Sequence, residues 1–263
     1  MNNFLLMRIL RRRSVHVALL IGFIISFAYI MIDVFPYRMY LGNPYNMWIE
    51  TYSMARFQTI FFLVSPILAA MGVGDLYRAD ENSGYINHIF AKGSRKAYFT
   101  RLYLGNFMVG GLCFVLPLVF NLYCCFMLLP NRAPDMVIDD AVNVTLKESI
   151  TIFPELYYNH PLLHVGLYLI IGFLLGALYS TMALCAGFIL KNRFFVVLTA
   201  FIISYVYTAA SFHIDKMGKY VPKGFEKQLG GCNDPMAIII FFSVGFSITT
   251  IVYILLARKR CIQ

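Results

Sequence analysis

The stretch from Phe57 to Arg101 decides the fold. FQTIFFLVSPILAAMGVG (57–74) is followed by DLYRADENSGYINHIFAKGSRKAYFTR (75–101), and a second long apolar segment begins at Leu102. The first piece is uncharged over a length that can cross a bilayer, since a helix rises about 1.5 Å per residue and the hydrocarbon core is about 30 Å thick. The second piece holds eight charged residues. The pattern predicts a polar island between two membrane helices.

The whole chain repeats this apolar character. Of its 263 residues, 60% are hydrophobic and 13% charged, and the mean hydropathy is +0.70, which excludes an ordinary soluble domain. The long runs are apolar on every face, whereas barrel strands would alternate apolar and polar residues. We therefore expect an all-α integral membrane protein, residues 1–263 forming a single transmembrane domain. Its six predicted spans are 15–34, 56–74, 102–129, 162–190, 194–213 and 235–257.

Lysine and arginine predict the orientation, because they are retained on the cytoplasmic side. With both termini inside, fourteen of the 22 basic residues fall in the cytoplasm together with three acids, Asp75, Asp80 and Glu81. The predicted topology is N-in and C-in, with external loops at 35–55, 130–161 and 214–234. Membrane orientation thus explains the net charge of +9 without a nucleic-acid partner. The fourteen basic residues are Arg8, Arg11, Arg12, Arg13, Arg78, Lys92, Arg95, Lys96, Arg101, Lys191, Arg193, Arg258, Lys259 and Arg260.

Motifs for chemistry are absent from the sequence. It contains no phosphate-binding loop, no H-E-x-x-H and no G-x-S-x-G. No C-x-x-C pair suggests a metal site. No ionisable residue lies deep in a predicted span, which disfavours a proton- or sodium-driven transporter. We expect no catalytic residue, no metal and no cofactor in this chain.

Three further segments carry structural predictions. Gly172, Gly176 and Ser180 form a small-residue stripe that indicates either helix packing within the chain or a subunit interface. Residues 1–13 form either a basic amphipathic helix in the inner interface or simple positive flanking. In the last external loop, residues 220–225 combine Tyr220, Val221, Pro222 and Phe225, so interfacial or re-entrant structure competes there with a solvated loop.

The cytoplasmic segment 75–101 has the pattern of a short amphipathic helix. Ser83 and Gly84 suit a helix start or turn, and Gly93 can end the helix. Basic residues near that end complement a helix C-terminus. An inner-leaflet interfacial helix without a partner would have the same pattern. The predicted apolar face consists of Tyr85, Ile86, Ile89 and Phe90.

This segment resembles the loop after the second span in ABC-2-type permease subunits. An acidic pair, a Ser-Gly pair, an apolar stretch and then Ser-Arg and an aromatic residue carry the resemblance. The six-span layout and the basic ends of the chain are similar too. The residues concerned are Asp80, Glu81, Ser83, Gly84, Ser94, Arg95 and Tyr98.

The resemblance implies a permease subunit of an ATP-binding cassette exporter, and we expect it in the plasma membrane of a bacterium. It implies a separate ATPase subunit that binds ATP and Mg, a second permease subunit in a homo- or heterodimer, and surrounding membrane lipids. The coupling helix would map onto residues 80–90. A hydrophobic or antimicrobial peptide is the expected cargo, with a lipid-linked or drug-like molecule as the alternative; a non-transporting scaffold or sensor and an unrecognised membrane enzyme stay open. The coupling residues would be Asp80, Glu81, Ser83, Gly84, Tyr85, Ile86, Ile89, Phe90 and Arg95.

Overall fold

A computed structural model describes most of the chain. The described residues are 7–9, 11–36, 38, 43–49, 56–92, 94–135, 151–211, 213, 218–228, 232 and 234–262. Within these ranges every regular element is helical. Of the features predicted above, Gly93, residues 1–6 and 10 of the N-terminal segment, and parts of all three external loops lie outside them.

In the described part of the chain, six helices are long and apolar enough to cross a membrane, as predicted. The protein is therefore built as a multi-pass membrane protein. The first span continues as a π-helix, η1 (Ile30–Val34), and the others are unbroken α-helices. The six are α2 (Arg13–Tyr29), α4 (Arg56–Val73), α7 (Arg95–Leu128), α10 (Pro161–Ile189), α11 (Arg193–Ser211) and α13 (Pro235–Ile262).

Most predicted boundaries agree with these helices to within two residues. Pro161 occupies the first position of α10, where its missing N–H is not needed. The predicted start of the third span at 102 was seven residues late, because α7 already begins at Arg95. The last helix also runs on past 257, through the basic residues to Ile262. The hydropathy pattern predicts the apolar part of a helix, but it does not show how far the helix continues through polar residues beyond that part.

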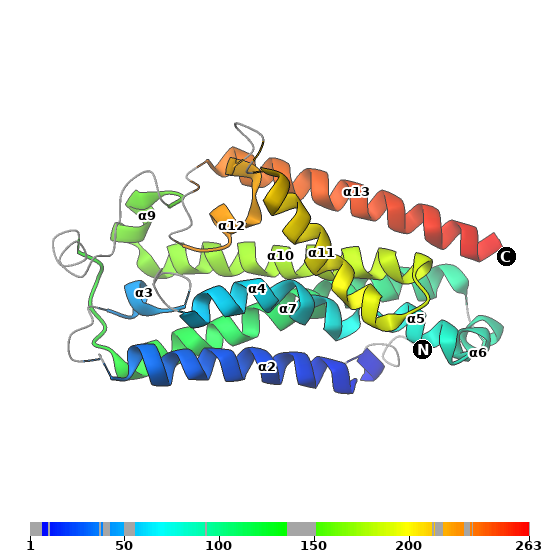
Figure 1. The fold of residues 1–263 in the computed structure, drawn as a ribbon, viewed down its shortest axis with the longest axis horizontal. Helices are drawn as coiled ribbons and strands as arrows, with labels where there is room; N and C mark the ends of the chain where they lie inside the picture. Colours follow the sequence, from blue (N-terminus) through cyan, green and yellow to red (C-terminus); the bar gives the residue numbers. More distant parts are fainter. Residues whose placement is uncertain are drawn as a thin grey trace.

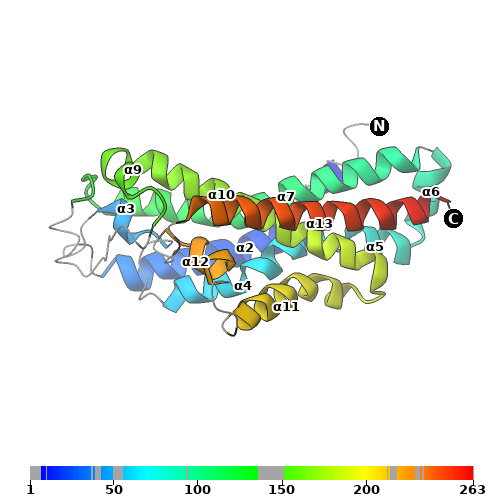
Figure 2. The ribbon, with the colours of Figure 1, turned by 90° about the horizontal axis from the view of Figure 1, so that it is seen from above.

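The short elements gather at the two ends of the bundle (Figures 1 and 2). Helices α5 (Leu76–Asn82) and α6 (Tyr85–Lys92) lie at one end, which also holds the start of α2 and the end of α13. We call this the α6 end. The opposite end holds α3 (Pro44–Met47), α9 (Pro154–Asn159), η2 (Gly218–Tyr220) and α12 (Pro222–Phe225).

Helix α10 is the centre of the bundle and packs most extensively against α7. The small-residue stripe lies in this contact: a Cβ built on Gly176 would meet the carbonyl oxygen of Gly110 at 2.6 Å. Ser180 Oγ donates a 2.7 Å hydrogen bond to Asn106 Oδ1 of α7. Gly172 faces the ring of Phe114. The stripe therefore serves helix packing within the chain, which is the first of the two predicted roles.

Three buried polar side chains form a hydrogen-bonded cluster, which we call the polar clasp, at the end of the bundle opposite the α6 end. Trp48 Nε1 donates a 2.7 Å hydrogen bond to Gln228 Oε1, and Gln228 Nε2 also contacts His164 Nδ1. His164 lies on α10, so the clasp joins three distant segments. The prediction of a solvated loop is wrong for Val221 and Phe225, because both residues are buried. Phe225 packs on aromatic rings of α13.

Candidate functional site

The polar segment after α4 forms two helices and not the single helix predicted over residues 80–90. Helix α5 ends at Asn82, and Ser83 and Gly84 form the turn before α6. Gly84 has φ of +69°, which glycine adopts without strain. The acidic pair thus belongs to α5, whereas the predicted apolar residues belong to α6.

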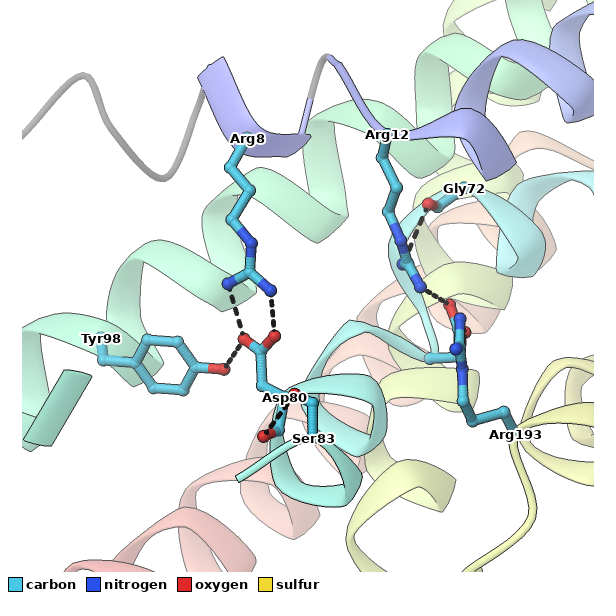
Figure 3. A network of polar contacts seen from close by, with 8 residues as sticks. Arg8, Arg12, Gly72, Asp80, Ser83, Tyr98 and Arg193 are labelled. Carbon is cyan, nitrogen blue, oxygen red and sulfur yellow. Dashed lines mark hydrogen bonds and ion pairs between the residues drawn. The ribbon is translucent and has the colours of Figure 1, made fainter. Parts of the chain in front are cut away.

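Asp80 is the centre of a buried ion pair (Figure 3). Its side chain is 0% exposed, and it accepts hydrogen bonds from both terminal nitrogens of the Arg8 guanidinium. Tyr98 Oη of α7 donates a third hydrogen bond of 2.8 Å to Asp80 Oδ2. A buried carboxylate is stable only with such partners. Asp80 therefore fixes α5 to the N-terminal segment and to α7, and it has no free surface for a partner protein.

Asp75, at the start of α5, joins two other segments. Arg193 Nε donates a 2.8 Å hydrogen bond to Asp75 Oδ2 from the start of α11. Arg12 Nη2 lies 2.8 Å from Asp75 Oδ1, as an ion pair without hydrogen-bond alignment. Arg12 Nη1 also donates to the Gly72 carbonyl at 3.3 Å. Burial lowers the pKa of Arg12, and the attraction of Asp75 opposes this shift.

Glu81 completes the set on the next face of α5. It pairs with Arg78 of the same helix and lies 3.3 Å from Arg260 at the end of α13. Arg78 Nε also donates a 2.9 Å hydrogen bond to the carbonyl of Gly187 in α10. Tyr77 Oη donates to Glu81 at 3.3 Å, and burial, followed by the charge of Glu81, raises the pKa of Tyr77 to about 12. Each acid of α5 is therefore paired.

These contacts make α5 a hub, by which we mean Asp75, Arg78, Asp80 and Glu81 with their partners. The hub connects α5 to the N-terminal segment, α7, α10, α11 and α13. Paired and hydrogen-bonded buried charges fix geometry, although they are weak evidence for stability. A displacement of α5 must break the hub or move those five segments with it.

Helix α6 presents its apolar side to the bundle. Ile86 is buried, and Ile89 and Phe90 pack against the same core as Tyr98 and Phe99. Two cations lie over its rings: Arg8 Cζ is 4.5 Å from the centroid of Tyr85, and Arg95 Cζ is 5.1 Å from that of Phe90. Helix α6 therefore has the predicted apolar face, and this face packs against the bundle.

The outer side of α6 is polar. Asn87, His88 and Ala91 are exposed, as are Asn82 and Ser83 at the preceding turn. We call these five residues the α6 surface. Of the predicted coupling residues only Ser83 belongs to it; Gly84 and Glu81 are partly exposed beside it, and the others lie towards the bundle.

Sequence reasoning did not find the arginines of the hub or the role of Tyr98. Arg8 and Tyr98 lie 72 and 18 positions from Asp80 in the chain. Arg193 lies 118 positions from Asp75, so no local spacing in the sequence indicates these contacts. One signal was present: the predicted cytoplasmic side has only three acids, and all three lie within seven positions. Such a concentration of the rarer charge indicates a paired internal site.

No group of three His, Cys, Asp or Glu side chains in the described part of the chain is arranged to hold a metal ion. Comparisons with protein-family models, curated proteins and solved structures gave no match. The geometry of the hub and of the α6 surface therefore carries the functional argument.

Proposed function

We propose that this chain is the permease subunit of an ATP-binding cassette exporter. It forms the translocation path, and a separate ATPase subunit binds ATP and Mg²⁺. The hub supports this proposal: the helix next to the α6 surface is attached through ion pairs and hydrogen bonds to five other segments of the bundle. A receptor for force needs this combination of an exposed contact and rigid internal connections.

In this mechanism the ATPase contacts the α6 surface from the cytoplasm. Closure of the ATPase pushes α6 and, through the Ser83–Gly84 turn, α5. Asp80 transmits the displacement to α7 through Tyr98, and Asp75 transmits it to α11 through Arg193. The bundle then shifts between two packed states, as discrete rearrangements of helices do. The charge asymmetry of the sequence supports a cytoplasmic position for the α6 end.

The proposal includes a second permease subunit and a membrane environment. In the apolar part of α11 only 17% of the residues are buried within the chain, and in that of α13 only 22%. The corresponding share is 56% for both α4 and α10. Lipid and a second copy or a related subunit would cover these faces. The proposed cargo is a hydrophobic or antimicrobial peptide, which passes between the two permease subunits; a lipid-linked or drug-like cargo is the alternative outcome.

The test is ATP turnover in a reconstituted complex. The chain is purified gently from native membranes with its partners, and the complex is placed in lipid vesicles with candidate peptides. His88→Glu changes an exposed residue of the α6 surface, so it should reduce peptide-stimulated ATP hydrolysis at least tenfold and leave folding intact. His160→Glu is the matched control, because His160 is exposed at the opposite end.

Two results would contradict the proposal. In one, no ATP-hydrolysing subunit accompanies the chain. In the other, an ATPase binds but no cargo changes its turnover or crosses the vesicle membrane, which is the behaviour of a scaffold or sensor.

A further inference from the structure

A cavity of about 460 Å³ lies at the end of the bundle opposite the α6 end. Its walls come from the first half of α4, the second half of α11 and the segment that includes α12, which lies beside the end of α11 in Figure 1. None of its lining residues belongs to the hub. The site is therefore separate from the proposed coupling region.

One wall of the cavity carries a buried carboxylate. Glu226 is 9% exposed, and its carboxylate, unlike its backbone N–H, makes no hydrogen bond or ion pair with any residue that the structure describes. Burial raises the pKa of Glu226 to about 7, whereas Lys227 and Lys223 oppose this shift from a distance. An unpaired buried carboxylate is costly, so the cavity has the chemistry of a site for a cation.

The neighbouring lysine does not supply that cation. Lys227 Nζ instead donates a 3.4 Å hydrogen bond to Gln58 Oε1 and lies 5.4 Å from the ring centroid of Phe62. Lys223, which also lines the cavity, is exposed. The lining thus holds a buried negative group with an exposed positive group three residues away in the chain.

Two hydroxyl groups of α11 complete the polar part. Ser204 Oγ donates to Tyr179 Oη at 3.4 Å, and Thr208 Oγ1 donates to the Ser204 carbonyl at 2.8 Å. Both residues line the cavity, and since their protons are engaged, their oxygens can serve only as acceptors for a ligand there. A primary ammonium group, which has three N–H donors, matches the carboxylate and these two oxygens.

Apart from Thr59 and His213, the remaining lining is apolar or aromatic, and part of it is exposed on the outer surface of the spans. Leu63 of α4 is 50% exposed and Tyr205 of α11 is 62% exposed, and both lie in spans. Phe62, Pro66 and Phe201 line the space between them. A ligand that fills the site must therefore join a charged head to a hydrocarbon tail.

We propose that this cavity binds a phospholipid with a primary-amine headgroup, of the phosphatidylethanolamine class. The ammonium group occupies the space beside Glu226, Ser204 and Thr208. The phosphate lies towards Lys223, and the acyl chains follow Leu63 and Tyr205 into the bilayer. The site needs neither an ATPase nor a cargo, so it stands or fails independently of the transport proposal.

The experiment measures lipid binding to the purified chain alone. The chain is placed in nanodiscs that contain phosphatidylethanolamine, phosphatidylcholine or phosphatidylglycerol with identical acyl chains, and retained lipid is counted by native mass spectrometry. We expect phosphatidylethanolamine to bind about tenfold more tightly than the other two, because only its headgroup donates three N–H bonds to an ionised acceptor. Glu226→Gln should abolish this preference, and Glu155→Gln, at an exposed site of the same end, should keep it.

A second measurement covers the case in which Glu226→Gln is poorly folded. Binding of phosphatidylethanolamine to the wild type should increase from pH 6 to pH 8, as the carboxylate ionises. Lys223, Lys227, Tyr205 and His213 also face the cavity, and a His213→Gln variant separates any contribution of that imidazole. Equal binding of the three lipids by the wild type would overturn the proposal. So would an unchanged preference in Glu226→Gln, or equally tight binding of phosphoethanolamine that carries no acyl chains.

Discussion

The carboxylate of Asp80 and the phenol of Tyr98 are joined by a 2.8 Å hydrogen bond in a site closed to solvent. The two residues belong to different helices, α5 and α7, and Arg8 approaches the same carboxylate from the N-terminal segment. Because α7 packs along the central helix α10, the bond fixes the short helix to the body of the bundle.

Removing this bond should loosen α5 without unfolding the bundle. Tyr98→Phe keeps the ring in contact with Phe90 and Phe99, and it should lower the free energy of unfolding by about 1–3 kcal/mol, the value of a hydrogen bond to a charged group. Asp80→Asn should cost more, about 2–4 kcal/mol, because it also leaves Arg8 without its charge partner. Unfolding in detergent measures both. Glu155→Gln, at an exposed site of the opposite end, should stay within about 0.5 kcal/mol.

The contact between α7 and α10 should tolerate no added methyl group. In Gly176→Ala the new carbon would lie 2.6 Å from the Gly110 carbonyl oxygen, so we expect a loss of about 1–3 kcal/mol in unfolding free energy. Gly166→Ala lies on the same helix with nothing within 4 Å and provides the matched comparison. Equal stability of the two variants would show that the helices do not approach this closely.

The polar clasp can be followed with the single tryptophan of the chain. Gln228→Ala removes the acceptor of the Trp48 indole N–H and leaves a buried donor unsatisfied, at a cost of about 1–3 kcal/mol. We expect a shift in Trp48 fluorescence at the same time, since its surroundings admit water. A spectrum identical to that of the wild type would contradict the clasp.

Glu226 should make the free energy of unfolding fall as the pH rises, whereas an acid in a salt bridge makes it rise. Burial raises its pKa from the ordinary 4.5 to about 7, so the folded protein binds more protons than the unfolded chain between these values. The free energy of unfolding should therefore fall as the pH rises from about 4.5 to 7, by about 3 kcal/mol from this residue. In lipid-free detergent, the advantage of Glu226→Gln over the wild type should be absent at pH 4.5 and largest at pH 8. A constant difference would contradict the unpaired carboxylate.

The six spans could be predicted from the sequence because each buries or presents an apolar surface on every side. The turn at Gly84 was also visible, since glycine followed by an apolar periodic stretch is a local signal. The inward direction of Ile86 and Phe90 was not, because an amphipathic helix has the same pattern whether its apolar face meets a partner, a lipid or its own bundle.

The ion pairs and the lipid cavity depend on long-range packing. Arg8 and Asp80 are separated in the chain by two transmembrane spans, so only the folded bundle brings them together. Glu226 appears in the sequence as one acid in a basic loop, which suggests a solvated position. The structure buries it because Val221 and Phe225 fold α12 onto the spans.

Crosslinking from the α6 surface tests the central claim most directly. A photoreactive amino acid is placed at His88, and in a second variant at Phe153, which is 51% exposed at the opposite end. After illumination of native membranes, the account predicts that the His88 variant crosslinks to an ATP-hydrolysing subunit with a phosphate-binding loop and that the Phe153 variant does not. Crosslinking of His88 to lipid alone, or of an ATPase to Phe153 instead, would contradict it.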